Sequence, residues 1–265
     1  MNQSIKVLEQ IQQRLSVSMI MTPRSDLRTC KSNDTVESVI STNHQEFTWF
    51  PVVTGDGHIS QVFDASLCRG APREALVSDF CVPINESIII GGDASIYEFI
   101  DAADRQRFRL VVSGNEVSGL VTISDLQQLP VRVAIFSLIT NLEIVLADVI
   151  TSQYPDDNDW IKKLSPNRQA KLQAAVDGSR KSDLAVSKMV LTQFADKTSL
   201  AIKLDLIDLP NVRLRKLFEK INMLRNEIAH SANFADDDQK ATELCSTVKN
   251  IFEIKKRIRS ANPAS

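Results

Sequence analysis

Residues 117–126 read VSGLVTISDL and decide the fold of the first half of the chain. Residues 117–121 form a short apolar strand pattern, and Thr122 and Asp125 then stand three apart, as at the start of a helix. A second apolar stretch lies just upstream, across a Ser-Gly-Asn-Glu turn at 113–116. The pattern therefore predicts a β-hairpin that runs directly into a helix.

The same pattern occurs once earlier in the chain. Met21-Thr22-Pro23 lies sixty residues before Cys81-Val82-Pro83, and each is followed by an apolar stretch, a helix start and a hairpin. The expected hairpin strands are 50–53 with 59–63, and 110–112 with 117–121. Two copies of a unit this long are too few for a solenoid. We therefore expect copies at 19–70 and 80–130, each in the order strand, helix, strand, strand, helix, packed about a pseudo-twofold axis.

This repeat resembles a tandem pair of CBS motifs, often called a Bateman module, over about residues 17–130. Members of that family bind adenine nucleotides in clefts between the two copies. The resemblance implies that Thr122 meets a phosphate, that Asp125 accepts from the ribose hydroxyls, and that Gly119 lets the backbone approach the ligand. The implied cofactor is an adenine nucleotide as a regulatory ligand. ATP, ADP, AMP, a dinucleotide and S-adenosylmethionine all fit the pattern.

Thr122 and Asp125 also have a purely structural interpretation, because a hydroxyl and an acid three residues apart form a capping box. The full repeat favours ligand contact over capping alone. Copy one departs from the pattern, since Asp64 takes the place of Thr122 and Leu67 that of Asp125. An aspartate repels phosphate and a leucine does not bind a diol, so we expect one competent cleft and one degenerate cleft.

Composition limits the class of protein. The chain has 43% hydrophobic and 24% charged residues, an ordinary balance for a soluble protein. It has no uninterrupted apolar run near the ~20 residues of a membrane span, so we expect no membrane partner. The four cysteines are scattered without a C-x-x-C pair, which predicts reduced thiols in the cytoplasm and no metal site: Cys30, Cys68, Cys81 and Cys245.

The net charge of −2 divides unevenly along the chain. Residues 1–130 hold 10 Lys and Arg against 16 Asp and Glu, whereas residues 131–265 hold 21 against 17. The two halves thus carry −6 and +4. This difference is either chance variation between two solvated surfaces or a sign that the second half meets a polyanion such as RNA.

After Pro130 the apolar residues follow helical spacing, and no strand pattern appears. The N-terminal residues 1–16 also look like a polar helix. The expected helices of the second half lie at 131–152, 167–176, 182–207, 212–230 and 236–259. The expected fold class is therefore an α+β half with two β-α-β-β-α repeats, followed by an all-α helical bundle. The expected division is 1–130 and 131–265.

Residues 225–230 read RNEIAH, near the end of the 212–230 helix. They combine a permanent cation, a polar amide and a titratable imidazole. Asn226 and His230 share a helical face, whereas Arg225 and His230 lie about 140° apart around the axis. The two converge more easily if His230 ends the helix or if a second copy of the chain supplies half of the site.

This half resembles the HEPN family of helical-bundle domains over about residues 131–260, through its R-N-x-x-A-H motif and the acid Glu143 on a long first helix. Family members are frequently dimers, and many cleave RNA without a metal. The resemblance implies a catalytic group of four residues: His230 as acid and base, Arg225 as phosphate clamp, Asn226 as orienting amide, and the acid Glu143. Glu143 is either solvated at the edge of the apolar stripe or paired with Arg225.

Two functions fit these patterns. The first is an adenine-nucleotide-regulated, metal-independent endoribonuclease whose active site is shared by two protomers, with RNA, the nucleotide and a second copy of the chain as partners. The alternative is a non-catalytic scaffold that senses the nucleotide, dimerises and regulates another protein. Arg225 and His230 distinguish the two, because only the first function requires them for RNA chemistry.

Overall fold

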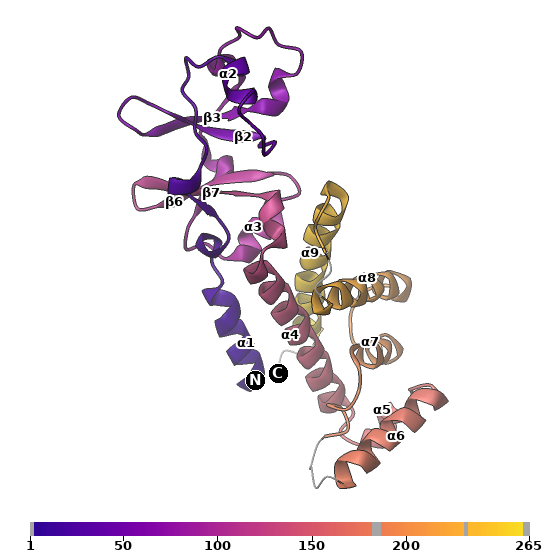
Figure 1. Ribbon diagram of the computed structural model, residues 1–265. Helices are drawn as coiled ribbons and strands as arrows, with labels where there is room; N and C mark the ends of the chain where they lie inside the picture. The colour runs from indigo at the N-terminus through magenta and orange to yellow at the C-terminus, as the bar shows by residue number, and fades with distance from the viewer. Residues whose placement is uncertain (1–2, 182–186, 231–232, 262–265) are drawn as a thin grey trace. The chain divides into compact units, whose positions relative to one another are not determined.

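The computed structural model describes residues 3–181, 187–230 and 233–261 (Figure 1). The chain divides into two compact units, a repeat unit of residues 15–130 and a helical unit of residues 1–14 and 131–265. The expected α+β half followed by a helical half is confirmed. Residues 1–14, which the sequence-based division placed with the repeat, are instead grouped with the helical unit, where α1 (Gln3–Arg14) buries Ile5.

The repeat unit contains two sheets. One has the strand order β1-β7-β6-β5, and the other has the order β2-β3-β4. Both predicted hairpins form, as β2–β3 and β6–β7. The strand bounds are β1 (Thr22–Pro23), β2 (Trp49–Val53), β3 (Ile59–Asp64), β4 (Cys81–Pro83), β5 (Ile89–Gly91), β6 (Phe108–Ser113) and β7 (Glu116–Thr122). Gly57 and Gly114 in the two hairpin turns have positive φ, a conformation that glycine adopts without steric cost.

The two copies exchange their first strands. β1 opens copy one but pairs with β7 of copy two, and β4 opens copy two but pairs with β3 of copy one. The two sheets also correspond at their opposite edges. In one sheet β5 runs parallel to β6, and in the other Cys30 makes the corresponding parallel bridge to Val52 on β2. A shared core reinforces this exchange, because Val62 of copy one packs in one cluster with Leu110 and Leu120 of copy two.

Side-chain caps set the helix starts that the sequence predicted. Thr35 accepts from the Ser38 amide at 3.2 Å and begins α2 (Val36–Ile40), while Ser95 and Glu98 form a capping box that begins α3 (Ile96–Ala102). The helix that closes each copy is shorter than expected. Each is a 3₁₀ turn, η3 (Ala65–Cys68) in copy one and η6 (Ile123–Gln127) in copy two.

The helical unit contains α1 and the helices that follow the repeat. Their bounds are α4 (Leu129–Gln153), α5 (Asp157–Ile161), α6 (Pro166–Lys181), α7 (Phe194–Lys203), α8 (Asn211–Ala229) and α9 (Asp238–Ala261). The apolar face of α8 is buried at Leu214, Phe218, Ile221, Leu224 and Ile228, and Leu217 beside them is half-buried.

The prediction of one helix over 182–207 is wrong for residues 187–193, which precede α7, and for residues 204–207, which follow its end at Lys203. Residues 182–186 lie outside the described residues. A capping box explains where α7 starts, because the Gln193 amide donates to Asp196 Oδ2 at 3.0 Å. Arg168 on α6 also pairs with the Asp196 carboxylate and holds it at this helix start.

Among the described helices, α4 has the length and mean hydropathy (2.0) to cross a membrane, although polar residues interrupt its apolar sequence. In the most apolar stretch, 61% of the residues are buried inside the protein. The core helix of a globular fold meets the same criteria, so α4 is weak evidence for a membrane segment.

Candidate functional site

A cavity of about 320 Å³ lies within the repeat unit. Its wall comes from three segments, 22–28 and 45–49 of copy one and 120–125 of copy two. The structure thus brings Thr122 and Asp125 to one cavity, as the pattern of residues 117–126 suggested. The exchanged strand β1 supplies Thr22 to the same wall, so the cavity depends on the pairing of β1 with β7.

Asp125 is the most constrained acid of this cavity. Its Oδ2 accepts from the Thr122 amide at 2.6 Å and from the Thr122 hydroxyl at 3.1 Å, and its Oδ1 accepts from Gln128 Nε2 at 2.7 Å. Burial raises the pKa of this carboxyl, and the three hydrogen bonds oppose the shift.

The capping interpretation of Thr122 and Asp125 is therefore correct, and it leaves room for a ligand. A carboxylate has about four acceptor positions, and three are used. The remaining position, on Oδ1, suits one hydroxyl of a ribose. Gln128 also donates to the Ile20 carbonyl at 2.6 Å, which fixes the amide that holds Asp125 in place.

Two aromatic rings in the cavity wall were missed by the sequence analysis. Phe47 is 42% exposed and packs edge-on against Phe50, while the Trp49 ring lies 5.1 Å from that of Phe108. Aromatic faces of this kind stack on nucleic-acid bases. The signal was present as the run Phe47-Thr48-Trp49-Phe50, which contains one of only two tryptophans, but its first part lies outside the repeated pattern.

Gly119 has a packing role in the structure. A Cβ added there would lie 2.5 Å from the Thr22 carbonyl oxygen and 2.8 Å from Met21 Sδ. The missing side chain therefore lets β1 approach β7, and it acts on the cavity through this strand pairing.

The positions in copy one that correspond to Thr122 and Asp125 have other uses. Asp64 caps η3 by accepting from the Ser66 amide at 2.9 Å, and the side chain of Leu67 is 57% exposed. Asp64 therefore keeps the helix-start role of Thr122, while Leu67 offers no acceptor for a diol.

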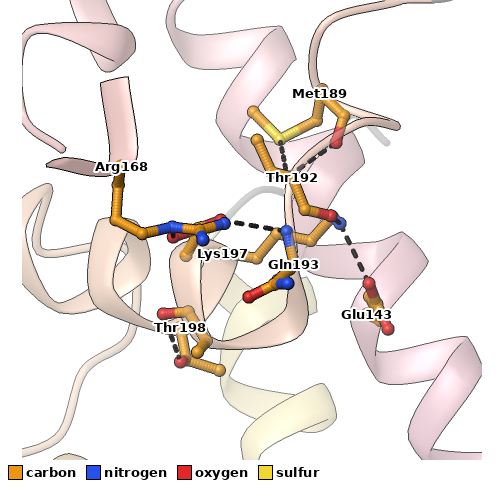
Figure 2. Close-up of polar contacts among 9 residues, drawn as sticks. Glu143, Arg168, Met189, Thr192, Gln193, Lys197 and Thr198 are labelled. Carbon is orange, nitrogen blue, oxygen red and sulfur yellow. Dashed lines mark hydrogen bonds and ion pairs between the residues drawn. The ribbon is translucent and has the colours of Figure 1, made fainter. Parts of the chain in front are cut away.

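Glu143 on α4 is the centre of a charged cluster in the helical unit, and Figure 2 shows it facing Lys197. Lys197 Nζ donates to Glu143 Oε1 at 2.9 Å and to the Thr192 carbonyl at 2.8 Å, and Arg225 Nη2 lies 3.9 Å from Glu143 Oε2. Lys197 is only 4% exposed. Glu143 is therefore paired, as one of the two interpretations expected, and its closest cation is Lys197. The sequence did not point to Lys197, because the residues around it show only helical spacing.

The remaining motif residues lie at the exposed end of α8. Asn226 and His230 are both exposed, and His230 ends the helix with its amide donating to the Asn226 carbonyl at 3.0 Å. Arg132 on α4 donates to the Ile228 carbonyl at 2.8 Å and ties this end of α8 to α4. The structure therefore directs Arg225 toward Glu143 and leaves Asn226 and His230 accessible.

No family model matches the chain, and no curated protein matches it. The chain is similar to solved structures of CBS domains. One is the CBS domain of a bacterial CNNM/CorC family Mg²⁺ transporter in complex with ATP, at 18% identity and TM-score 0.40 over 50% of this chain and 94% of that chain. Another is CBSX2 in complex with AMP, at 17% identity and TM-score 0.35 over 42% and 92%. A third is a hemolysin-like protein containing a CBS domain from Oenococcus oeni PSU. It shares 16% identity at TM-score 0.38, over 46% of this chain and 94% of that chain.

Proposed function

We propose that this chain is an adenine-nucleotide-regulated, metal-independent endoribonuclease, with a CBS pair as sensor and a HEPN-type helical unit as effector. The observation that carries the sensor half is the cavity that joins Asp125 to the rings of Phe47 and Trp49. A purine stacks on aromatic faces, and a carboxylate accepts from a ribose hydroxyl. The cavity volume falls in the range of small-ligand sites, roughly 300–1,000 Å³.

The proposed effector chemistry uses the residues at the end of α8. RNA supplies its own nucleophile, the 2′-hydroxyl. One imidazole accepts the 2′-hydroxyl proton as the new O–P bond forms, and a second donates a proton to the 5′-oxygen as the old P–O bond breaks. The products are a 2′,3′-cyclic phosphate and a 5′-hydroxyl. His230 of two protomers would supply both imidazoles.

Arg225 would stabilise the phosphorane charge in this scheme. A guanidinium binds two phosphate oxygens at once, and Lys does not reproduce this geometry. Glu143, with Lys197 behind it, would set the position of Arg225 without touching RNA. This moves Glu143 from the catalytic group of the sequence analysis to a positioning role.

The ribonuclease proposal is tested with purified protein and a mixed RNA substrate in EDTA. We expect wild type to leave 2′,3′-cyclic phosphate ends, His230→Ala to be inactive, and His44→Ala, a substitution of an exposed histidine in the repeat unit, to retain full activity. Equal cleavage by wild type and His230→Ala would contradict the proposal. Regulation is tested by adding adenine compounds to the same reaction and to an Asp125→Ala variant.

A non-catalytic sensor scaffold is the second candidate. The ion pair between the buried Lys197 and Glu143 favours it, because such a pair can hold helices together without any role in catalysis. If wild type cleaves no RNA with any adenine compound present, while Arg225→Ala alters self-association, the scaffold replaces the ribonuclease.

A further inference from the structure

The cavity of the repeat unit has an acidic wall. Of the residues that line it, all within the described part of the chain, the carboxylates are Asp26, Glu46 and Asp125, and the one cation is Arg28. Within that same part of the chain, none of the three carboxylates is in an ion pair. A concave, partly enclosed site focuses this charge on whatever it binds.

The hydrogen bonds in the wall make it a poor phosphate site. The Thr122 hydroxyl and amide, the donors expected for phosphate, both donate to Asp125. Arg28 Nη1 donates to the Thr42 carbonyl, so part of its guanidinium is already used. Each added phosphate of a nucleotide would therefore bring negative charge toward carboxylates that are hydrogen-bonded, as Asp125 is, but are not in an ion pair.

The same wall suits a ligand with positive charge. Once Asp125 accepts from a ribose, the remaining wall charges are two carboxylates, Asp26 and Glu46, and the guanidinium of Arg28. The 5′ substituent of S-adenosylmethionine has the complementary set, which is a sulfonium, an ammonium and a carboxylate. The adenine ring would still find the aromatic faces of Phe47 and Trp49.

We propose that this cavity binds a cationic adenosine derivative, of the S-adenosylmethionine class, in preference to nucleoside di- and triphosphates. The proposal rests on the proposed adenine site and names its ligand class. The carboxylates of Asp26 and Glu46 face the sulfonium and ammonium, and Arg28 faces the ligand carboxylate.

The test is isothermal titration of the full chain, at fixed pH and ionic strength, with S-adenosylmethionine, S-adenosylhomocysteine, adenosine, AMP and ATP with and without Mg²⁺. We expect S-adenosylmethionine to bind at least about tenfold more tightly than ATP, with AMP between them. S-adenosylhomocysteine, which lacks the sulfonium charge, should bind several-fold more weakly than S-adenosylmethionine. Added salt should reduce these differences.

Variants of the carboxylates that line the cavity then test whether their charge causes the preference for S-adenosylmethionine. Glu46→Gln should weaken S-adenosylmethionine about tenfold and leave adenosine unchanged, whereas Asp125→Ala should weaken every ribose-containing ligand. ATP binding more tightly than both S-adenosylmethionine and adenosine would overturn the charge preference and leave the adenine site standing. No binding of any adenine compound would overturn both the site and the preference.

Discussion

The two candidate sites differ in how completely one chain builds them. In the repeat unit, Asp125 is enclosed in a cavity whose wall is drawn from both copies, and its hydrogen bonds are nearly complete. In the helical unit, Arg225 is turned to Glu143, while Asn226 and His230 lie exposed at a helix end. Motifs of similar length thus give a partly enclosed cavity in one unit and an open set of side chains in the other.

This difference shows what positions the side chains of each candidate site. Strand exchange fixes the repeat cavity through the backbone, so its side chains are positioned before a ligand arrives. In the helical motif Arg225 contacts Glu143, whereas Asn226 and His230 are exposed, so under the proposed function a second protomer or an RNA would have to fix the positions of their side chains. The following predictions test this contrast, from the largest expected effect to the smallest.

Removing Glu143 should destabilise the helical unit most. Glu143→Ala leaves the buried Lys197 ammonium without its counterion, and breaking such a pair costs about 3 kcal/mol in the free energy of unfolding. Urea unfolding followed by circular dichroism measures the change. The matched control is Asp159→Ala, which removes the exposed pair with Lys162 and should leave the free energy of unfolding nearly unchanged. Equal effects would mean that the Lys197 pair is not structural.

Filling the contact at Gly119 should disrupt the repeat unit. Gly119→Ala places a Cβ 2.5 Å from the Thr22 carbonyl oxygen, so β1 must move away from β7, at a cost of about 2 kcal/mol. Thermal unfolding and ligand titration should both show the loss. Gly55→Ala is the control, because a Cβ there meets nothing within 4 Å, and it should leave both measurements unchanged.

Changing the charge of Asp125 should affect affinity and its pH dependence. Asp125→Asn should weaken ribose-containing ligands about tenfold, since an amide is a weaker acceptor than a carboxylate. Burial raises the pKa of Asp125, and the ligand needs the ionised form, so wild-type affinity should fall as the pH drops through this raised pKa. The loss should begin at a higher pH than for an ordinary aspartate, and titrations across pH should be flatter for Asp125→Asn. A wild-type curve as flat as that of the variant would place the ligand away from Asp125.

The motif residues on α8 should have the smallest effect on stability. His230→Ala should change the free energy of unfolding by less than ~0.5 kcal/mol, because the side chain is exposed at a helix end. Arg225→Ala should cost less than ~1 kcal/mol, since its contact with Glu143 is 3.9 Å long and its side chain is 39% exposed. A larger loss of stability in either variant would make it unsuitable for isolating catalysis from folding.

The hairpins and capped helix starts of the repeat were predictable because they depend on local chemistry. Thr35 and Ser95 cap helices through neighbours three residues away or fewer, and Gly57 and Gly114 set turns by their own backbone angles. These signals do not depend on the rest of the fold.

The features that the sequence did not reveal depend on distant residues. The exchange of β1 and β4 is set by pairing across the two copies, and Phe47 and Trp49 become candidate ligand contacts only because they line the same cavity as Asp125. The start of α7 depends on Arg168, 28 residues away, which holds Asp196 at the cap. Helical spacing continues on both sides of Phe194, where α7 starts, so the sequence pattern predicted one unbroken helix.

The exchanged strand also has a kinetic consequence. Thr22 pairs with Leu120, so closing this sheet requires a loop of nearly one hundred residues, and contacts of such sequence separation form slowly. During synthesis from the N-terminus, the cavity remains open on one side until residues past 125 have emerged. A ligand that needs the closed cavity would then bind only the fully folded repeat and would retard its opening. Protection of the β1 and β7 amides from hydrogen exchange, with and without ligand, would reveal this coupling directly.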